Sequence, residues 1–147
     1  MEKQWTNELE LSFPAKSMNE GLARMTVAAF LTEMNPTISE VDDVKTAVSE
    51  AVTNAIVHGY RDENQQVHIS CRWRDQLFQV EISDHGIGIE DVQKAREPFF
   101  TTRPEENRVG MGFAFMEAFM DEVEIYSKPR EGTRVILRKH IGKEGVS

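Results

Sequence analysis

Two polar side chains, Glu50 and Asn54, lie four residues apart in the stretch SEAVTNAIVHGY, residues 49–60. At about 100° per residue, an α-helix brings this carboxylate and this carboxamide onto one face, about 40° apart. Such a pair offers a proton acceptor and oxygen ligands side by side. An isolated pair of this kind is more often part of a solvated face, because charged residues are mostly exposed. The pair alone therefore does not decide between chemistry and solvation.

The stretch ISDHGIGIE, residues 82–90, carries a second candidate site. Asp84, Gly86 and Gly88 form a D-x-G-x-G motif at the end of an expected strand, where glycines let the backbone turn and approach a flat ligand closely. The aspartate there can accept a hydrogen bond from an exocyclic amine. We assign no chemistry to His85, which lies between them. The same motif often marks an ordinary turn.

Two further glycine motifs follow along the chain. Gly110, Met111 and Gly112 open an expected helix, and glycine amides at a helix N-terminus suit phosphate oxygens. Gly132 and Thr133 begin the last expected strand, where a simple hairpin turn is the alternative.

The elements that must position these residues follow from hydrophobic periodicity and from caps. We expect helices from Ser17 to about Met34, with Ser17 and Glu20 as a capping box, from Ser39 to His58 with Gly59 as its stop, and near residues 112–120. Strands are expected at residues 8–13, 66–73, 77–83, 122–127 and 133–140, and residues 96–112 lack periodicity. Hairpins dominate this order, which predicts a two-layer α/β sandwich: a mixed, mostly antiparallel sheet with helices on one face.

The two long helices differ in their apolar faces. On the second helix, seven apolar side chains share one arc, with Glu50 and Asn54 roughly opposite: Val41, Val44, Val48, Ala51, Val52, Ala55 and Ile56. On the first helix, we expect Met18, Leu22, Met25 and Ala29 to face inward. Val27, Phe30, Leu31 and Met34 then remain on the rest of its surface, near Arg24. A helix that is apolar on two sides is either wedged between layers or meets a partner.

Composition excludes several classes of protein. A chain of 147 residues suits one domain, spanning residues 1–147, that needs neither disulfides nor metals for its core. Its single Cys71, the lack of a signal sequence and the lack of an apolar run of about 20 residues predict a cytoplasmic protein without a membrane span. The net charge of −8 argues against direct binding of nucleic acid.

Together and in this order, the motifs resemble the ATP-binding domain of the GHKL superfamily, which includes histidine kinases, gyrase, Hsp90 and MutL. Within that superfamily, the stretches SEAVTNAIVHGY, PFFTTRPE, GMGFAFMEAFMDEVEI and GTRV are similar to the bacterial anti-sigma factors with serine kinase activity. The resemblance covers nearly the whole chain.

The resemblance implies a role for each motif. Asn54 would bind Mg²⁺, a hard cation that prefers oxygen, and Glu50 would orient or deprotonate an attacking serine. Asp84 would contact adenine with Thr133 nearby, Gly86 and Gly88 would allow close approach, and Gly110, Met111 and Gly112 would contact phosphate. Residues 96–112 would form a lid over ATP. Thr101, Thr102 and Arg108 in that lid are further candidates for phosphate contacts.

The resemblance also implies partners. The expected function is inhibition of a sporulation sigma factor of the sigma F type, together with ATP-dependent phosphorylation of an anti-anti-sigma factor on serine. Arg24 would contact a partner, and the protein would be a homodimer. Three alternatives remain open: a stress-response anti-sigma B kinase, an ATP-dependent binding module without kinase activity, and an interaction domain whose glycines serve only turns.

Overall fold

The computed structural model describes residues 4–59, 65–89, 92, 96 and 112–142. Five strands form one sheet in the order β1-β2-β3-β5-β4, and every pair of neighbours is antiparallel. The strands are β1 (Asn7–Pro14), β2 (Gln66–Arg74), β3 (Leu77–Asp84), β4 (Glu122–Lys128) and β5 (Gly132–His140). The helices are α1 (Asn19–Leu31), the short 3₁₀ helix η1 (Thr32–Met34), α2 (Ile38–Thr53), the π-helix η2 (Asn54–Gly59) and α4 (Gly112–Phe119).

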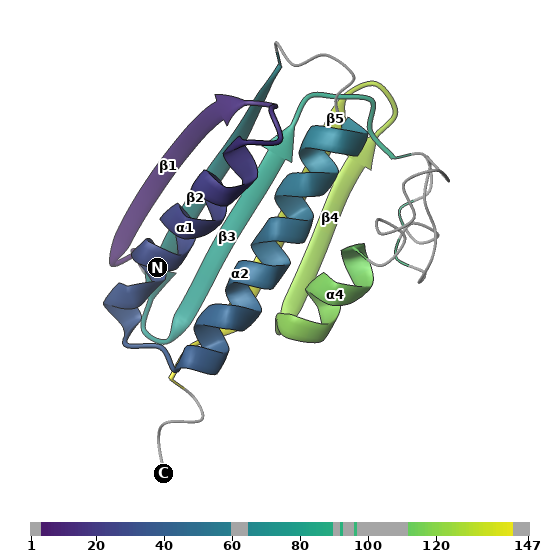
Figure 1. Ribbon diagram of the computed structural model, residues 1–147. Helices are drawn as coiled ribbons and strands as arrows, with labels where there is room; N and C mark the ends of the chain where they lie inside the picture. The colour runs from purple at the N-terminus through teal and green to yellow at the C-terminus, as the bar shows by residue number, and fades with distance from the viewer. Residues whose placement is uncertain (1–3, 60–64, 90–91, 93–95, 97–111, 143–147) are drawn as a thin grey trace.

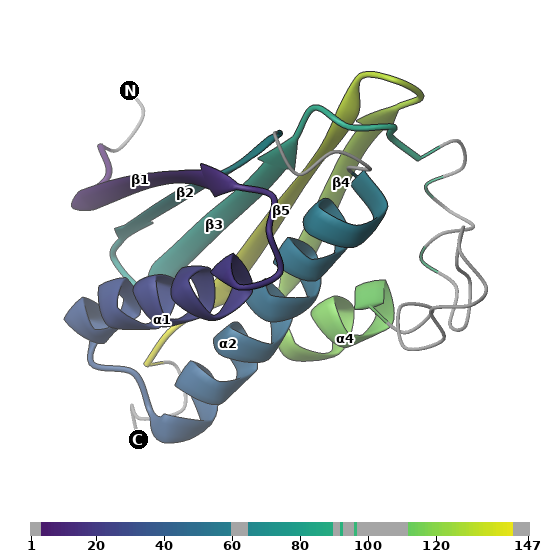
Figure 2. The same cartoon turned by 45° about the horizontal axis from the view of Figure 1, so that its top comes forward.

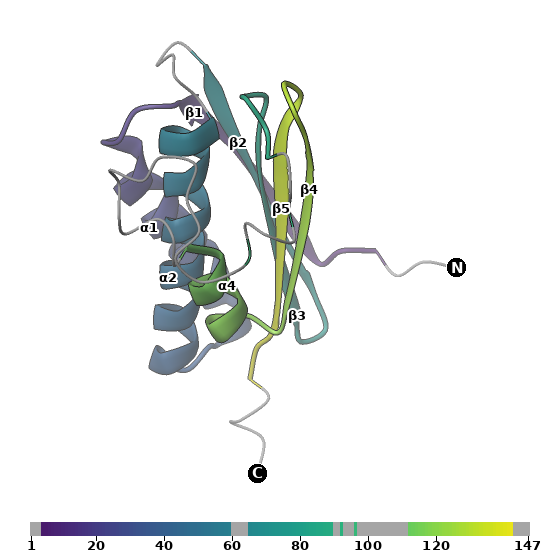
Figure 3. The same ribbon diagram turned by 90° about the vertical axis from the view of Figure 1, so that its right-hand side faces the viewer.

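The three α-helices cover one face of the sheet and leave its other face open (Figures 1 and 3). This arrangement confirms the expected two-layer α/β sandwich. The described part of the sheet is antiparallel throughout, whereas the sequence had left a mixed sheet open. Alternate residues of β3, namely Phe78, Val80 and Ile82, point to the helices and are almost fully buried. Their burial identifies the helix side as the core side.

The predicted faces of α1 are wrong. Ala23, Val27 and Leu31 are buried, and the ring of Phe30 contacts that of Phe78 with centroids 6.4 Å apart. The stripe expected to face inward is instead exposed: Met18 by 80%, Leu22 by 54% and Met25 by 56%, with Ala29 exposed too. Both stripes are apolar, so periodicity alone could not choose between them.

The predicted helix caps also need correction. The Ser17 side chain does not cap α1, whose N-cap is Met18 without a side-chain hydrogen bond. Thr37, rather than Ser39, caps α2 in a complete capping box: its hydroxyl accepts from the Glu40 N–H (3.1 Å), and Glu40 accepts from the Thr37 N–H (2.9 Å). Such a cap stabilises a helix by about 1 kcal/mol. The cap fixes the start of α2 and thereby the register of Glu50.

The end of α2 lies where the candidate site is expected. The helix passes directly into η2, which begins at Asn54 and contacts both β3 and β5. Single-turn π-helices within or beside α-helices frequently mark functional sites. The end of β3 and the hairpin between β4 and β5 lie at this same end of the sheet (Figure 1). In the described residues, no helix is long and apolar enough to cross a membrane.

Candidate functional site

Asp84, the last residue of β3, is a buried carboxylate that is only 5% exposed. Its Oδ1 accepts a hydrogen bond from the Gly86 N–H at 2.9 Å, which explains the turn that follows the strand. Burial raises the pKa of Asp84 above its usual range, while the N–H groups of Gly86 and Thr133 and the charge of His85 oppose that rise. A buried carboxylate needs hydrogen-bond donors around its oxygen atoms, so this one suits a ligand that donates hydrogen bonds.

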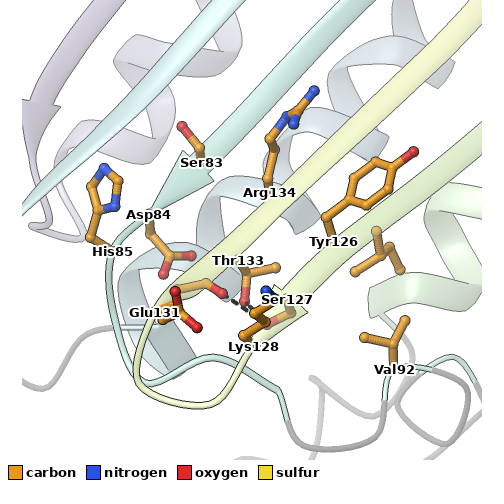
Figure 4. A pocket seen from close by; sticks show the side chains of 12 residues that line it. Ser83, Asp84, His85, Val92, Tyr126, Ser127, Lys128, Glu131, Thr133 and Arg134 are labelled. Atoms are coloured by element: carbon orange, nitrogen blue, oxygen red, sulfur yellow. Dashed lines mark hydrogen bonds between the residues drawn. The ribbon is translucent and has the colours of Figure 1, made fainter.

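Asp84 belongs to a row of polar side chains that crosses three strands on the helix side of the sheet. Asp84 pairs with Thr133 of β5, and Thr133 pairs with Ser127 of β4. The Ser127 and Thr133 hydroxyl oxygens are 2.8 Å apart (Figure 4). The sequence had suggested Asp84 and Thr133 but missed Ser127. The signal that could have found it was the register of the β4–β5 hairpin, which places Ser127 opposite Thr133.

Two glycines hold the loop after Asp84 against this hairpin. Gly88 has φ +75°, and a Cβ there would lie 2.0 Å from the backbone oxygen of Lys128. Gly132 has φ +97°, and a Cβ there would lie 2.1 Å from the backbone oxygen of Asp84. The Arg130 N–H donates to the Ile87 carbonyl at 2.6 Å and ties the loop to the hairpin. The packing of this loop against the hairpin therefore requires glycine at position 88, in addition to the expected close approach of the backbone to a ligand.

A cavity of about 570 Å³ lies at this end of the sheet. Its walls come from both faces: Asp84 and Thr133 from the helix side, and Ser83, Tyr126 and Arg134 from the open side (Figure 4). Ile125, which packs against the core, also lines it. The hairpin residues Ser127, Lys128, Glu131 and Gly132, together with His85 and Val92, complete the lining. A volume of this size is typical of small-molecule sites.

Glu50 and Asn54 form a second cluster, which faces α4. A Cβ on Gly112 would lie 3.1 Å from Nδ2 of Asn54, 3.4 Å from its Oδ1 and 3.5 Å from Oε2 of Glu50. Glu50 is only 8% exposed, so its simple interpretation as part of a solvated face is wrong. The physical reason is that α4 packs beside α2 in the same helix layer (Figure 2), so Gly112 at the start of α4 covers the flank of α2 that carries Glu50 and Asn54. The lining of the cavity does not include these three residues.

The structure thus brings the predicted residues together as two clusters near one end of the sheet. Asp84, Gly86, Gly88 and Thr133 belong to the first, and Glu50, Asn54 and Gly112 to the second. The predicted phosphate contacts Thr101, Thr102, Arg108, Gly110 and Met111 lie outside the described residues and remain predictions. Among the described residues, no group of three or more His, Cys, Asp or Glu side chains could hold a metal ion. A divalent cation here would need ligand phosphates beside the Asn54 oxygen.

Arg24 lies on α1, away from both clusters and beside the exposed apolar stripe. Its Nε is 3.4 Å from Oε2 of Glu20, one turn earlier, and its side chain is 40% exposed. Met18, Leu22 and Met25 are exposed on the same stretch of chain. We call Met18, Leu22, Arg24 and Met25 the α1 face.

Comparison with known families defines the class of protein. Residues 13–139 match the family described as histidine kinase-like ATPase domain. The catalytic domain of the histidine kinase ThkA has a similar fold, with a TM-score of 0.56 and 16% identity over 90% of this chain and 96% of that chain. The RsbU and RsbW domains of a Mycobacterium tuberculosis protein align with a TM-score of 0.67 at 20% identity, covering 92% of this chain and 32% of that one. At this identity the similarity concerns the fold alone.

Closer relatives narrow the class. The chain is 55% identical over 138 residues to the anti-sigma F factor of Anoxybacillus flavithermus, covering 93% of this chain and 94% of that protein. It is 51% identical over 133 residues to the anti-sigma F factor of Clostridium acetobutylicum, covering 90% and 93% respectively. The chain belongs to the anti-sigma F factor family of histidine kinase-like ATPase domains.

Proposed function

We propose that this protein binds and inhibits a sporulation sigma factor of the sigma F type and uses ATP to phosphorylate an anti-anti-sigma factor on serine. The family membership and the two polar clusters support this function together. The protein would act in the cytoplasm as a homodimer, with residues 1–147 as one kinase domain. Sedimentation velocity at micromolar concentration tests the dimer directly.

The observation that carries the proposal is the approach of Gly112 to Glu50 and Asn54. A glycine at the start of α4 keeps 3.1–3.5 Å between the position of a Cβ and the polar atoms of those two side chains. A helix N-terminus favours anions because its first N–H groups are unpaired and its dipole is positive there. A triphosphate at this point would meet the α4 amides, the Asn54 carboxamide and the Glu50 carboxylate.

One cluster would bind the base of the nucleotide and the other its phosphates. Asp84 would accept from the exocyclic amine of adenine, and Thr133 would line the same end of the base pocket. The Asn54 oxygen would hold a Mg²⁺ ion, which would supply charge neutralisation for phosphoryl transfer. Glu50 would orient the serine hydroxyl and accept its proton as the phosphoryl group is transferred.

The α1 face would bind the protein partners. It offers three exposed apolar side chains together with Arg24, whose guanidinium is paired with Glu20 and is partly exposed. Aromatic, methionine and arginine side chains are enriched at protein interfaces. Because Arg24 lies apart from the nucleotide clusters, Arg24→Glu should weaken partner binding and leave ADP binding intact. Lys16→Glu, at an exposed residue just before α1, is the matched control.

Single-turnover phosphorylation with saturating Mg-ATP tests the kinase activity. Glu50→Gln should bind Mg-ATP nearly as well as the parent and transfer phosphate about 10²- to 10⁴-fold more slowly, the usual cost of losing a general base. Asp42→Asn, at an exposed acid on the same helix, should transfer at the parental rate. Transfer by Glu50→Gln at close to the parental rate would exclude this carboxylate as the base.

An ATP-dependent binding module without kinase activity is the second candidate. It predicts Mg-ATP binding that depends on Asp84 and Asn54, with no transfer of radiolabelled phosphate to the partner. The burial of the Glu50 carboxylate next to Asn54 favours the kinase, because a carboxylate is costly to desolvate in a site that only binds anionic phosphates.

A further inference from the structure

We propose that Ser127 determines the base specificity of the nucleotide site by fixing Thr133 as a hydrogen-bond acceptor toward the cavity. This inference rests on the proposed binding of a nucleotide base beside Asp84 and Thr133. Ser127 would thereby act as a positioning residue, because it works through Thr133 and not by its own contact with the base.

Three hydrogen-bond contacts converge on the Ser127 hydroxyl. The Ile89 N–H donates to Oγ at 2.8 Å. The hydroxyl donates to the Gly132 carbonyl oxygen at 2.9 Å. The third contact, 2.8 Å long, joins Oγ of Ser127 to Oγ1 of Thr133, and its direction follows from the other two.

A serine hydroxyl has one hydrogen and two lone pairs. The Gly132 carbonyl can only accept, so the single hydrogen of Ser127 is committed to it. One lone pair receives the Ile89 N–H, and the other is left for Thr133. The Thr133 hydroxyl must therefore donate to Ser127, because the reverse direction would place two acceptors 2.9 Å apart at Gly132.

This direction decides what Thr133 offers to a ligand. With its hydrogen used by Ser127, Thr133 presents only lone pairs to the cavity that it lines. Asp84 lies directly across the β3–β5 pair, and its carboxylate is an acceptor as well. Two adjacent acceptors suit an amino group, which has two N–H donors. The same two acceptors would repel a carbonyl oxygen at that position. The site should therefore favour a 6-aminopurine over a 6-oxopurine.

Ser127→Ala tests this inference because it frees the Thr133 hydrogen. The probes are ADP and inosine diphosphate, which differ at the 6-position of the purine, and titration calorimetry gives both dissociation constants. The parent should prefer ADP. In Ser127→Ala, the freed Thr133 hydroxyl can donate to the 6-oxo group, so the preference should fall by about five- to tenfold, as expected for one hydrogen bond. Ser127→Thr keeps the hydroxyl and should keep the preference.

A second pair of variants tests the inference even if Ser127→Ala fails to fold. Thr133→Val removes the acceptor and should reduce the preference for ADP, whereas Thr133→Ser should retain it. In the Thr133→Val background, the further change Ser127→Ala should not alter the preference. This non-additivity would show that Ser127 acts through Thr133.

The outcomes separate this inference from the proposed function. Equal losses of affinity for both nucleotides in Ser127→Ala, or an unchanged preference in Thr133→Val, would overturn the role of Ser127 while nucleotide binding stands. Failure of the folded parent to bind either nucleotide would overturn the proposed function and this inference with it.

Discussion

Substitution of Gly112 by alanine should separate nucleotide binding from stability. The added Cβ would lie 3.1 Å from Nδ2 and 3.4 Å from Oδ1 of Asn54, and 3.5 Å from Oε2 of Glu50. The first distance is shorter than an ordinary van der Waals contact, so the Asn54 carboxamide must shift by a few tenths of an ångström. Alanine is also preferred over glycine within helices by up to about 1 kcal/mol. The free energy of unfolding should therefore change by less than about 1 kcal/mol in either direction.

The substitution should slow the chemistry while the protein stays folded. A displacement of about 1 Å in a reacting group can cost about 10²-fold in rate, so a shift of a few tenths should cost roughly three- to tenfold. Single-turnover phosphorylation and Mg-ADP titration measure this loss, and thermal unfolding confirms the fold. Gly21→Ala is the matched control, because its Cβ would lie at an ordinary 3.7 Å from Arg24. Parental Mg-ADP affinity and transfer rate in Gly112→Ala would refute the assignment of this cluster to the phosphates.

Three further predictions concern the base pocket, the hairpin and the α1 face. Because burial raises the pKa of Asp84, this carboxylate gains a proton at a higher pH than an exposed aspartate does. ADP affinity should then begin to fall, as the pH is lowered, at a higher pH than the titration of an exposed aspartate would give, and binding to Asp84→Asn should be weaker and should lack this part of the pH dependence, as calorimetry would reveal. Gly132→Ala places a Cβ 2.1 Å from a backbone oxygen and should lower the free energy of unfolding by about 3 kcal/mol in urea titration. Gly142→Ala, with positive φ but no atom nearer than 4.0 Å, should cost less. Met25→Ser should weaken binding of the sigma factor without a loss of stability, because this side chain is 56% exposed, and equal affinity would count against the α1 face.

The sequence was informative wherever side-chain pattern and glycine position agree with local structure. The alternation of β1 and the glycines after β3 gave the strands and the turn at Asp84 close to their observed positions. The helix faces were harder to predict. Glu50 lies outside the apolar arc of α2, but α4, which begins 59 residues after the end of α2, packs against the flank that carries it. When a helix distant in the sequence buries a polar side chain, the hydrophobic periodicity around that side chain does not show it.

Two other features depended on contacts between distant segments. The stripes of α1 are both apolar, and the contact of Phe30 with Phe78 of β3 accompanies burial of one of them. The role of Ser127 depends on its pairing with Thr133 across the hairpin and on the Ile89 N–H from another loop. A lone serine near the end of a strand has no pattern that indicates such a network.

The central claim is that one nucleotide spans both polar clusters, and NMR titration of the folded protein with Mg-ADP tests it most directly. We predict that the backbone amides of Gly86 and Thr133 and the side-chain amide of Asn54 shift together and saturate at one nucleotide per chain. Gly142, two residues beyond the far end of β5, is the internal control and should not shift. A response of the Asp84 row alone, or different saturation points for the two clusters, would contradict a single nucleotide site.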